Sequence, residues 1–85
     1  MDIPRRRDGI QVREIDGETV ILDAQNERMH TLNATAAFIF GAVDGRRSMK
    51  EIWEELAARF EVDPETAERD TQEIVRQLRE QKLVV

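Results

Sequence analysis

A segment near the middle of the chain restricts the fold more than any other feature, because it carries both a helix start signal and one apolar face. Ser48 is followed three residues later by Glu51, which is the spacing of a capping box. Apolar residues then recur with the i, i+3, i+4, i+7 spacing of one helix face, at positions 49, 52, 53, 56, 57 and 60. The sequence therefore predicts an amphipathic helix over Met49–Phe60, with Trp53 as an anchor of the core.

A further helix is predicted directly after this one. Asp63 followed by Pro64 is the pattern of an N-cap and a first helical residue. The inner face of this helix carries four apolar residues, Ala67, Ile74, Val75 and Leu78. Because only the short Glu61–Val62 turn separates the two helices, we expect helix-turn-helix geometry.

The first third of the chain favours β-structure. Two strand-like runs, Ile10–Ile15 and Thr19–Ala24, flank Asp16–Gly17 and predict a hairpin. A three-residue loop, Ile15–Gly17, is preferred over a two-residue loop because it gathers the apolar side chains on one face of the sheet. The residues gathered on that face are Ile10, Val12, Val20 and Leu22.

The remaining segments complete the predicted order of elements. Arg28–Leu32 is a third short strand whose weak alternation leaves its buried face undecided, and Asn33 is an N-cap for a central helix that ends near Val43. The Lys82–Val85 tail is expected to pack against the sheet or the core. The predicted fold class is α+β, a winged helix-turn-helix with a three-stranded antiparallel sheet followed by three helices. We expect residues 1–85 to form a single domain, with residues 1–7 flexible.

Composition excludes several classes of function. The 85 residues include no cysteine, so neither a disulfide framework nor thiolate chemistry is available, which fits a cytoplasmic protein. No apolar run approaches the roughly 20 residues that a membrane span needs, and the start lacks the apolar region of a signal peptide. The formal net charge of -5 disfavours nucleic acid as a partner, because affinity for phosphates depends on Lys and Arg.

No group of residues in the sequence indicates catalysis. His30 is the only histidine, and on a short strand it is interpreted as a half-exposed structural residue. Glu51, Glu54 and Glu55 lie opposite the apolar stripe of their helix and are interpreted as a solvated surface. The basic cluster Arg5–Arg7 is interpreted as a disordered charged terminus, although contact with an acidic peptide or nucleic acid is the alternative. The sequence therefore predicts no enzymatic activity, no cofactor and no metal site.

At this point the chain resembles the PqqD-like family, the recognition elements for precursors of ribosomally synthesised and post-translationally modified peptides (RiPPs). The similarity depends on the order and spacing of many ordinary turn and capping signals. They are Arg7–Ile10, Val20–Asp23, Arg28–Asn33, Thr35–Ala36, Asp44–Gly45, Ser48–Leu56, Phe60–Pro64 and Leu78–Val84. The chain departs from the family in carrying Lys82 where glycine is common. It also lacks the further C-terminal aromatic residues of the pyrroloquinoline quinone type, so a lasso-peptide, sactipeptide-like or other pathway is equally open.

The resemblance implies a non-catalytic domain that binds the leader of a precursor peptide as an added strand. The leader would then be delivered to a modifying enzyme, often a radical SAM protein or a protease. The implied contacts are the third strand and the adjoining face of the last helix. The candidate residues are Arg28, Met29, His30, Thr31, Leu32, Glu73, Ile74 and Gln77.

Two alternatives follow from the same topology. A winged-helix DNA-binding transcriptional regulator is the first, but the last helix carries five acidic and only three basic residues between Pro64 and Glu80. A homodimer that pairs the same strand edge is the second, and it stays open.

Overall fold

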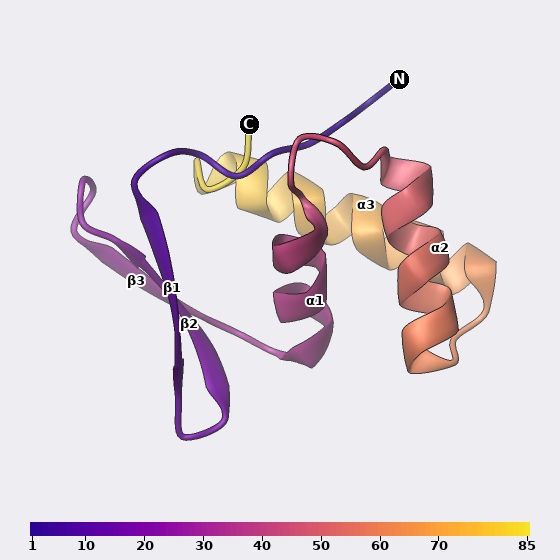
Figure 1. The fold of residues 1–85 in the computed structure, drawn as a ribbon, viewed down its shortest axis with the longest axis horizontal. Helices are drawn as coiled ribbons and strands as arrows, with labels where there is room; N and C mark the ends of the chain where they lie inside the picture. Colours follow the sequence, from indigo (N-terminus) through magenta and orange to yellow (C-terminus); the bar gives the residue numbers. More distant parts are fainter.

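The computed structural model describes residues 1–85 and confirms the predicted order of three strands and three helices (Figure 1). The strands are β1 (Ile10–Ile15), β2 (Glu18–Asp23) and β3 (Arg28–Leu32), and they form one antiparallel sheet with β2 in the centre. Both β1 and β3 therefore have one edge that no other strand covers.

The hairpin between β1 and β2 corrects the predicted register. Ile15 pairs with Glu18, so the loop has two residues, and the prediction of a three-residue loop is wrong. Asp16 and Gly17 have φ angles of 53° and 81°, and two successive positive φ values characterise the turn whose twist best matches a two-residue hairpin. The local turn chemistry of Asp-Gly therefore outweighs the gathering of apolar side chains on one face.

The register distributes the apolar residues over both faces of the sheet. Val12, Ile21 and His30 are directly paired and share the face that meets the helices, where Ile21 is fully buried. Val20 and Leu22 lie on the opposite face, not beside Val12 as the sequence predicted. The face of β3 that the sequence left undecided is thereby assigned, since Arg28, His30 and Leu32 point toward the helices.

The helix α1 (Ala34–Ala42) is central, as its uniformly apolar composition predicted. The side chain of Asn33 accepts a hydrogen bond from the backbone N–H of Ala36 at 2.8 Å and so begins the helix. The helix contacts α2 (Met49–Phe60), α3 (Pro64–Glu80) and β3. It therefore links the sheet to the helix-turn-helix pair.

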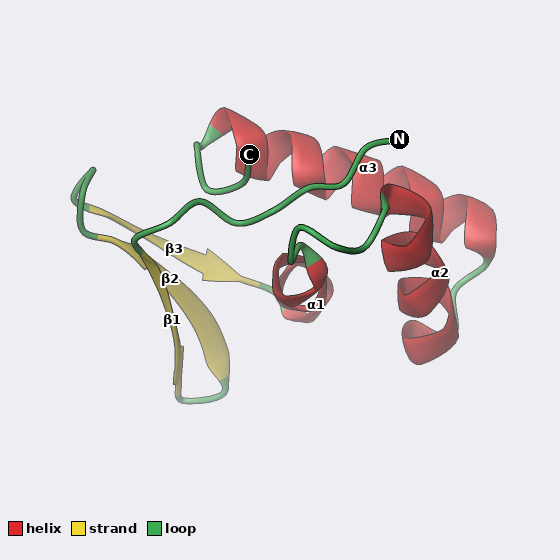
Figure 2. Ribbon diagram, turned by 45° about the horizontal axis from the view of Figure 1, so that its top comes forward, coloured by secondary structure: helices red, strands yellow, loops and turns green.

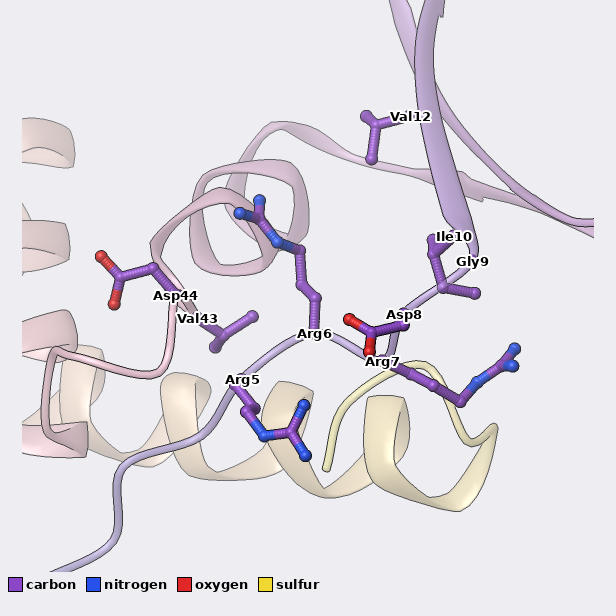
Figure 3. Close-up of a pocket in the computed structure, with 9 residues that line it drawn as sticks. All are labelled: Arg5, Arg6, Arg7, Asp8, Gly9, Ile10, Val12, Val43 and Asp44. Atoms are coloured by element: carbon purple, nitrogen blue, oxygen red, sulfur yellow. The ribbon is translucent and has the colours of Figure 1, made fainter.

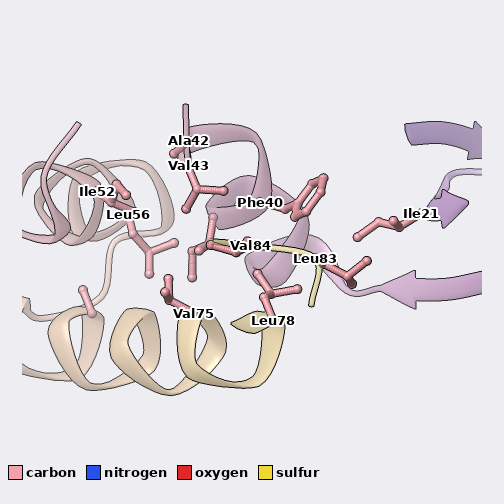
Figure 4. Packing of buried hydrophobic residues seen from close by; sticks show 12 residues of the cluster. Ile21, Phe40, Ala42, Val43, Ile52, Leu56, Val75, Leu78, Leu83 and Val84 are labelled. Carbon is pink, nitrogen blue, oxygen red and sulfur yellow. The ribbon is translucent and has the colours of Figure 1, made fainter. Parts of the chain in front are cut away.

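The helices α2 and α3 begin where the sequence predicts. The capping box of Ser48 and Glu51 is formed, and the Asp63 side chain accepts from the backbone N–H of Thr66 at 3.0 Å. Together with α1 they enclose one core, which Ile21 enters from the sheet (Figure 4). Each fully buried large apolar side chain contributes about 1.5–3 kcal/mol relative to an exposed one. The buried cluster is Ile21, Ile39, Phe40, Ala42, Val43, Ile52, Leu56, Ala67, Val75, Leu78, Leu83 and Val84.

The two chain ends lie side by side, and here the structure differs from the predicted flexible start. The backbone N–H groups of Arg6 and Arg7 donate to the carbonyl oxygens of Val43 and Leu83 at 3.1 and 3.0 Å. The N–H of Val85 donates to the Arg5 carbonyl at 2.8 Å. Pro4 is buried. Residues 2–7 therefore form an irregular strip that lies between the α1–α2 loop and the C-terminal tail (Figure 1).

None of the helices is both long enough and apolar enough to cross a membrane.

Candidate functional site

The free edge of β3 is the first component of the candidate site. A two-residue hairpin closes on a hydrogen-bonded pair, here Ile15 and Glu18, and bonded pairs then alternate along an antiparallel ladder. Residues 18, 20 and 22 of β2 therefore bond toward β1, and residues 19, 21 and 23 bond toward β3.

The alternation determines which backbone groups of β3 are free. Arg28, His30 and Leu32 pair with residues of β2 that bond toward β3, so their N–H and C=O groups are used in the ladder. The N–H and C=O groups of Met29 and Thr31 point to the open edge. The sequence left this choice open between the two sets, and the register of the sheet resolves it.

A groove beside this edge is the second component. It has a volume of about 280 Å³ and lies between β3, the start of α1 and the last turns of α3. In Figure 2, β3 lies on the side of the sheet that is nearer to α3. The lining residues are His30, Thr31, Leu32, Asn33, Ala36, Ile74, Gln77, Leu78 and Gln81.

Five of the eight residues predicted from the sequence line this groove, and three do not. His30, Thr31, Leu32, Ile74 and Gln77 come together from β3 and α3. Met29 is 68% exposed, and with Arg28 it borders a separate hollow near Leu22. Glu73 lies outside the groove and instead forms an ion pair with Arg76 and accepts a hydrogen bond from Gln77, both within α3.

Sequence reasoning missed four residues of the groove. Asn33 was read only as an N-cap, and Leu78 only as core. Gln81 lies four residues after Gln77, and this spacing places both on one helix face, so the periodicity of α3 could have identified it. Ala36 had no recognisable signal, because its position depends on how α1 packs beside β3.

The lining of the groove is neutral and mixed in polarity. Ile74 and Leu78 supply apolar surface, while Thr31, Gln77 and Gln81 supply groups that donate and accept hydrogen bonds. The carboxylate of Glu73 accepts a hydrogen bond from Gln77 of the groove at 3.2 Å and forms an ion pair with Arg76. A hydrogen bond from Arg76 holds the pKa of Glu73 below its ordinary value, so Glu73 stays charged and paired with that arginine.

His30 carries one unusual atom. Its Nε2 is buried and has no hydrogen-bond partner, although the side chain lines the groove. A buried polar atom without a partner costs about 1–3 kcal/mol, so a ligand that reaches it would recover that free energy.

His30 Nε2 has no hydrogen-bond partner, and no group of three or more His, Cys, Asp or Glu side chains is placed to hold a metal ion. The arrangement can do two things, which are to pair with an extended backbone along β3 and to accept side chains in the groove.

Comparisons with known proteins agree with this geometry. The family described as "Coenzyme PQQ synthesis protein D (PqqD)" matches residues 18–84. Among curated proteins, none matches the sequence significantly.

Three solved structures share the fold over nearly the whole chain. A structure of lasso peptide synthetase B1 complexed with the leader peptide is 30% identical, with a TM-score of 0.85 and 98% of each chain covered. TbiB1 in complex with the TbiA(beta) leader peptide is 28% identical, with a TM-score of 0.82 and coverage of 94% of this chain and 93% of its own. The PqqD truncation of PqqCD from Methylobacterium extorquens, described as a functional and stand-alone RiPP recognition element, has a TM-score of 0.80. The match is 24% identical in sequence and covers 96% of this chain and 87% of the PqqD truncation. This similarity supports the fold alone.

The family match extends over most of the chain, from β2 to the C-terminal tail, and the solved relatives have the same sheet and helices. This chain belongs to the PqqD family.

Proposed function

We propose that this protein binds the leader of a ribosomally synthesised precursor peptide by strand addition at β3 and delivers it to a modifying enzyme. The observation that carries the proposal is the combination of the open edge of β3 with the groove against α3. The leader backbone pairs with the N–H and C=O groups of Met29 and Thr31.

The alternation of side chains along an added strand gives the leader two rows. One row enters the groove beside His30, Ile74 and Leu78, where an apolar side chain is buried. The other row lies beside the exposed side chain of Met29 on the outer face. Leaders with an apolar residue at every second position of the paired segment are therefore preferred.

The two relatives of 28% and 30% identity are both complexes with leader peptides, which supports this choice of ligand. The similarity to lasso peptide synthetase B1 also favours a lasso-peptide pathway, and the modifying enzyme that the family resemblance implies is a radical SAM protein or a protease. We further propose that the chain acts as one domain without catalytic activity of its own. A cytoplasmic location and a homodimer both stay predictions.

A peptide titration followed by NMR tests the proposal. The probe is the leader of a short precursor encoded beside this chain, added to the ¹⁵N-labelled protein. The expected result is amide shift changes in residues 28–32 and at Ile74, Gln77 and Gln81. Changes confined to α2, or the absence of any change at millimolar peptide, would contradict the proposed site.

A further inference from the structure

A second hollow lies at the opposite edge of the sheet from the β3 site, beside β1. It has a volume of about 460 Å³, and residues of the N-terminal strip, β1 and the end of α1 line it (Figure 3). Its lining includes Arg5, Arg6, Ile10, Val12 and Val43. None of these residues lines the groove between β3 and α3.

Two arginines without an ion-pair partner are among the residues that line this hollow. Arg5 and Arg6 are exposed, and neither side chain forms an ion pair or a hydrogen bond with another residue. The Arg6 guanidinium lies 5.8 Å from the centre of the Phe40 ring, and Figure 3 shows it extended between α1 and β1. The backbone hydrogen bonds of the strip hold both residues in place, which a disordered terminus would not do.

The two acidic residues of the lining, Asp8 and Asp44, form no ion pair with Arg5 or Arg6. Asp44 accepts hydrogen bonds from the backbone N–H groups of Arg46 and Arg47 at 2.9 and 3.0 Å. Its carboxylate therefore stabilises the loop before α2. Asp8 is the other acidic residue, and it is exposed. In Figure 3 the Arg6 side chain extends toward the β1 side of the strip, whereas the Arg5 side chain extends toward α3, so Arg6 is the unpaired cation that lies nearer to the β1 edge.

The adjoining strand edge is also open. Because residues 11, 13 and 15 of β1 bond toward β2, the N–H and C=O groups of Val12 and Glu14 point away from the sheet. The Val12 side chain is 47% exposed and faces the hollow. The edge therefore offers backbone groups, an apolar side chain and positive charge to the same ligand.

We propose that the β1 edge, together with Arg6, binds an extended acidic segment of a partner protein. A peptide strand uses all three features, since its backbone pairs with β1, a carboxylate bonds the Arg6 guanidinium and its apolar side chains cover Val12. Nucleic acid has no backbone N–H to pair with a strand edge, and two arginines neutralise too few phosphates for stable binding. That this partner is the modifying enzyme rests on the proposed function, whereas the surface itself does not.

The test uses an eight-residue peptide of alternating glutamate and valine, titrated into the ¹⁵N-labelled full chain without any leader peptide. The expected result is amide shift changes at Arg6, Val12 and Glu14, with none at Met29 and Thr31. The same peptide with lysine in place of glutamate should produce no change. Changes at β3 instead of β1, or none at millimolar peptide, would overturn the proposal.

Matched variants separate charge at this surface from charge in general. Arg6→Gln should weaken the acidic peptide by at least about tenfold, because the charge-assisted bond to the guanidinium is lost. Arg69→Gln removes the same charge from an exposed arginine on α3, outside the β1 edge, and should leave the affinity within about twofold. Equal losses in both variants would overturn the proposal.

A second variant, Val12→Pro, tests the proposal independently in case the arginine variant does not fold. Val12→Pro removes a donor that points away from the sheet, so it should abolish binding of the acidic peptide while the fold persists. If Val12→Pro binds normally, or if Arg6→Gln changes only a monomer–dimer equilibrium or duplex DNA binding at 150 mM salt, the assigned occupant is wrong. Leader binding measured on the same variants should be unchanged, so a failure at β1 and a failure at β3 are distinguishable.

Discussion

The end of α3 depends on a single residue with an unfavourable backbone conformation. Lys82 has a φ of 62°, while its N–H donates to Arg79 and the N–H of Leu83 donates to Leu78, the two bonds of a Schellman motif. Glycine adopts this left-handed position without a Cβ penalty. The bonds turn the chain so that Leu83 and Val84 are buried.

Lys82→Gly should therefore raise the free energy of unfolding by about 1 kcal/mol. The backbone carbonyl of residue 82, which accepts from Arg7 Nε at 2.6 Å, is kept in the variant. Chemical denaturation of both proteins measures the difference. Lys82→Ala is the control, since it removes the same side chain but keeps the penalty, and an equal gain in Lys82→Ala would show that the backbone conformation is not the cause.

The start of α2 gives a second prediction at this scale. Ser48 Oγ accepts from the Glu51 N–H at 3.2 Å, and Glu51 Oε1 accepts from the Ser48 N–H at 3.0 Å. Ser48→Ala should lower the free energy of unfolding by about 0.5–2 kcal/mol through loss of this cap. Leader affinity should not change, because the groove is formed by other elements. A loss of affinity greater than tenfold in a folded variant would place the start of α2 in the binding surface.

Asp23 gives a prediction about acid stability. Its buried carboxylate accepts from Asn26 and lies 2.7 Å from Arg7 Nη2, and these contacts hold the pKa of Asp23 below its ordinary 3.8. A lowered pKa in the folded state stabilises the fold above about pH 3.8, and this contribution is lost as the pH falls through the folded value. Asp23→Asn should thus have a lower thermal midpoint than the parent at pH 7. The difference between the two proteins should shrink below about pH 4, and a constant difference from pH 7 to pH 2 would contradict the argument.

The strand β3 permits a prediction at the scale of an element. Proline removes one N–H donor and is tolerated on an edge when that donor does not serve the ladder. Met29→Pro and Thr31→Pro should therefore abolish leader binding with little change in thermal midpoint. Arg28→Pro and His30→Pro should lower the thermal midpoint, because each breaks a ladder bond to β2.

This proline series distinguishes strand addition from side-chain recognition. If Met29→Pro and Thr31→Pro bind the leader as the parent does, no backbone pairing occurs at β3. Met29→Ala and Thr31→Ala are the controls, since they remove the side chains and keep the donors.

Elements with strong local signals were predictable from the sequence, and the sheet register was not. The caps of α2 and α3 involve residues three positions apart, so they are visible in the sequence. The register depended on whether Asp16 would adopt a positive φ. The prediction favoured burial of Val12 on the same face as Val20, but β1 is an edge strand and leaves Val12 half exposed.

At the scale of the whole molecule, the unpredicted features join distant parts of the chain. Arg79 donates to Asp2 at 2.7 and 2.9 Å across 77 positions, and this contact cannot be seen in the sequence. The N-terminal strip was interpreted as disordered because only its composition was visible. The candidate site was predictable as β3 with one face of α3, because the family resemblance supplied that pairing. Glu73 does not line the groove, and the sequence alone does not show which residues of α3 meet β3.

The distribution of charge over the whole molecule predicts that it does not bind duplex DNA near physiological salt. Phosphate contacts need free cations, and α3, the helix that would enter the major groove, offers few of them. Arg76 is paired with Glu73 and Glu80, and Arg79 is paired with Asp2, which leaves Arg69 as its one unpaired basic residue. Five carboxylates on the same helix repel the backbone of a duplex.

A gel-shift or fluorescence anisotropy titration with a random 20-base-pair duplex at 150 mM salt checks this prediction. We expect no binding up to about 100 μM duplex, which is the weak end of ordinary non-specific affinity. The charge-reversal control Glu68→Lys with Glu73→Lys adds four positive units to α3 and should produce weak, salt-sensitive binding. A micromolar affinity of the parent protein that weakens with added salt would instead favour the DNA-binding regulator, because it would show that the acidic helix does not prevent phosphate contacts.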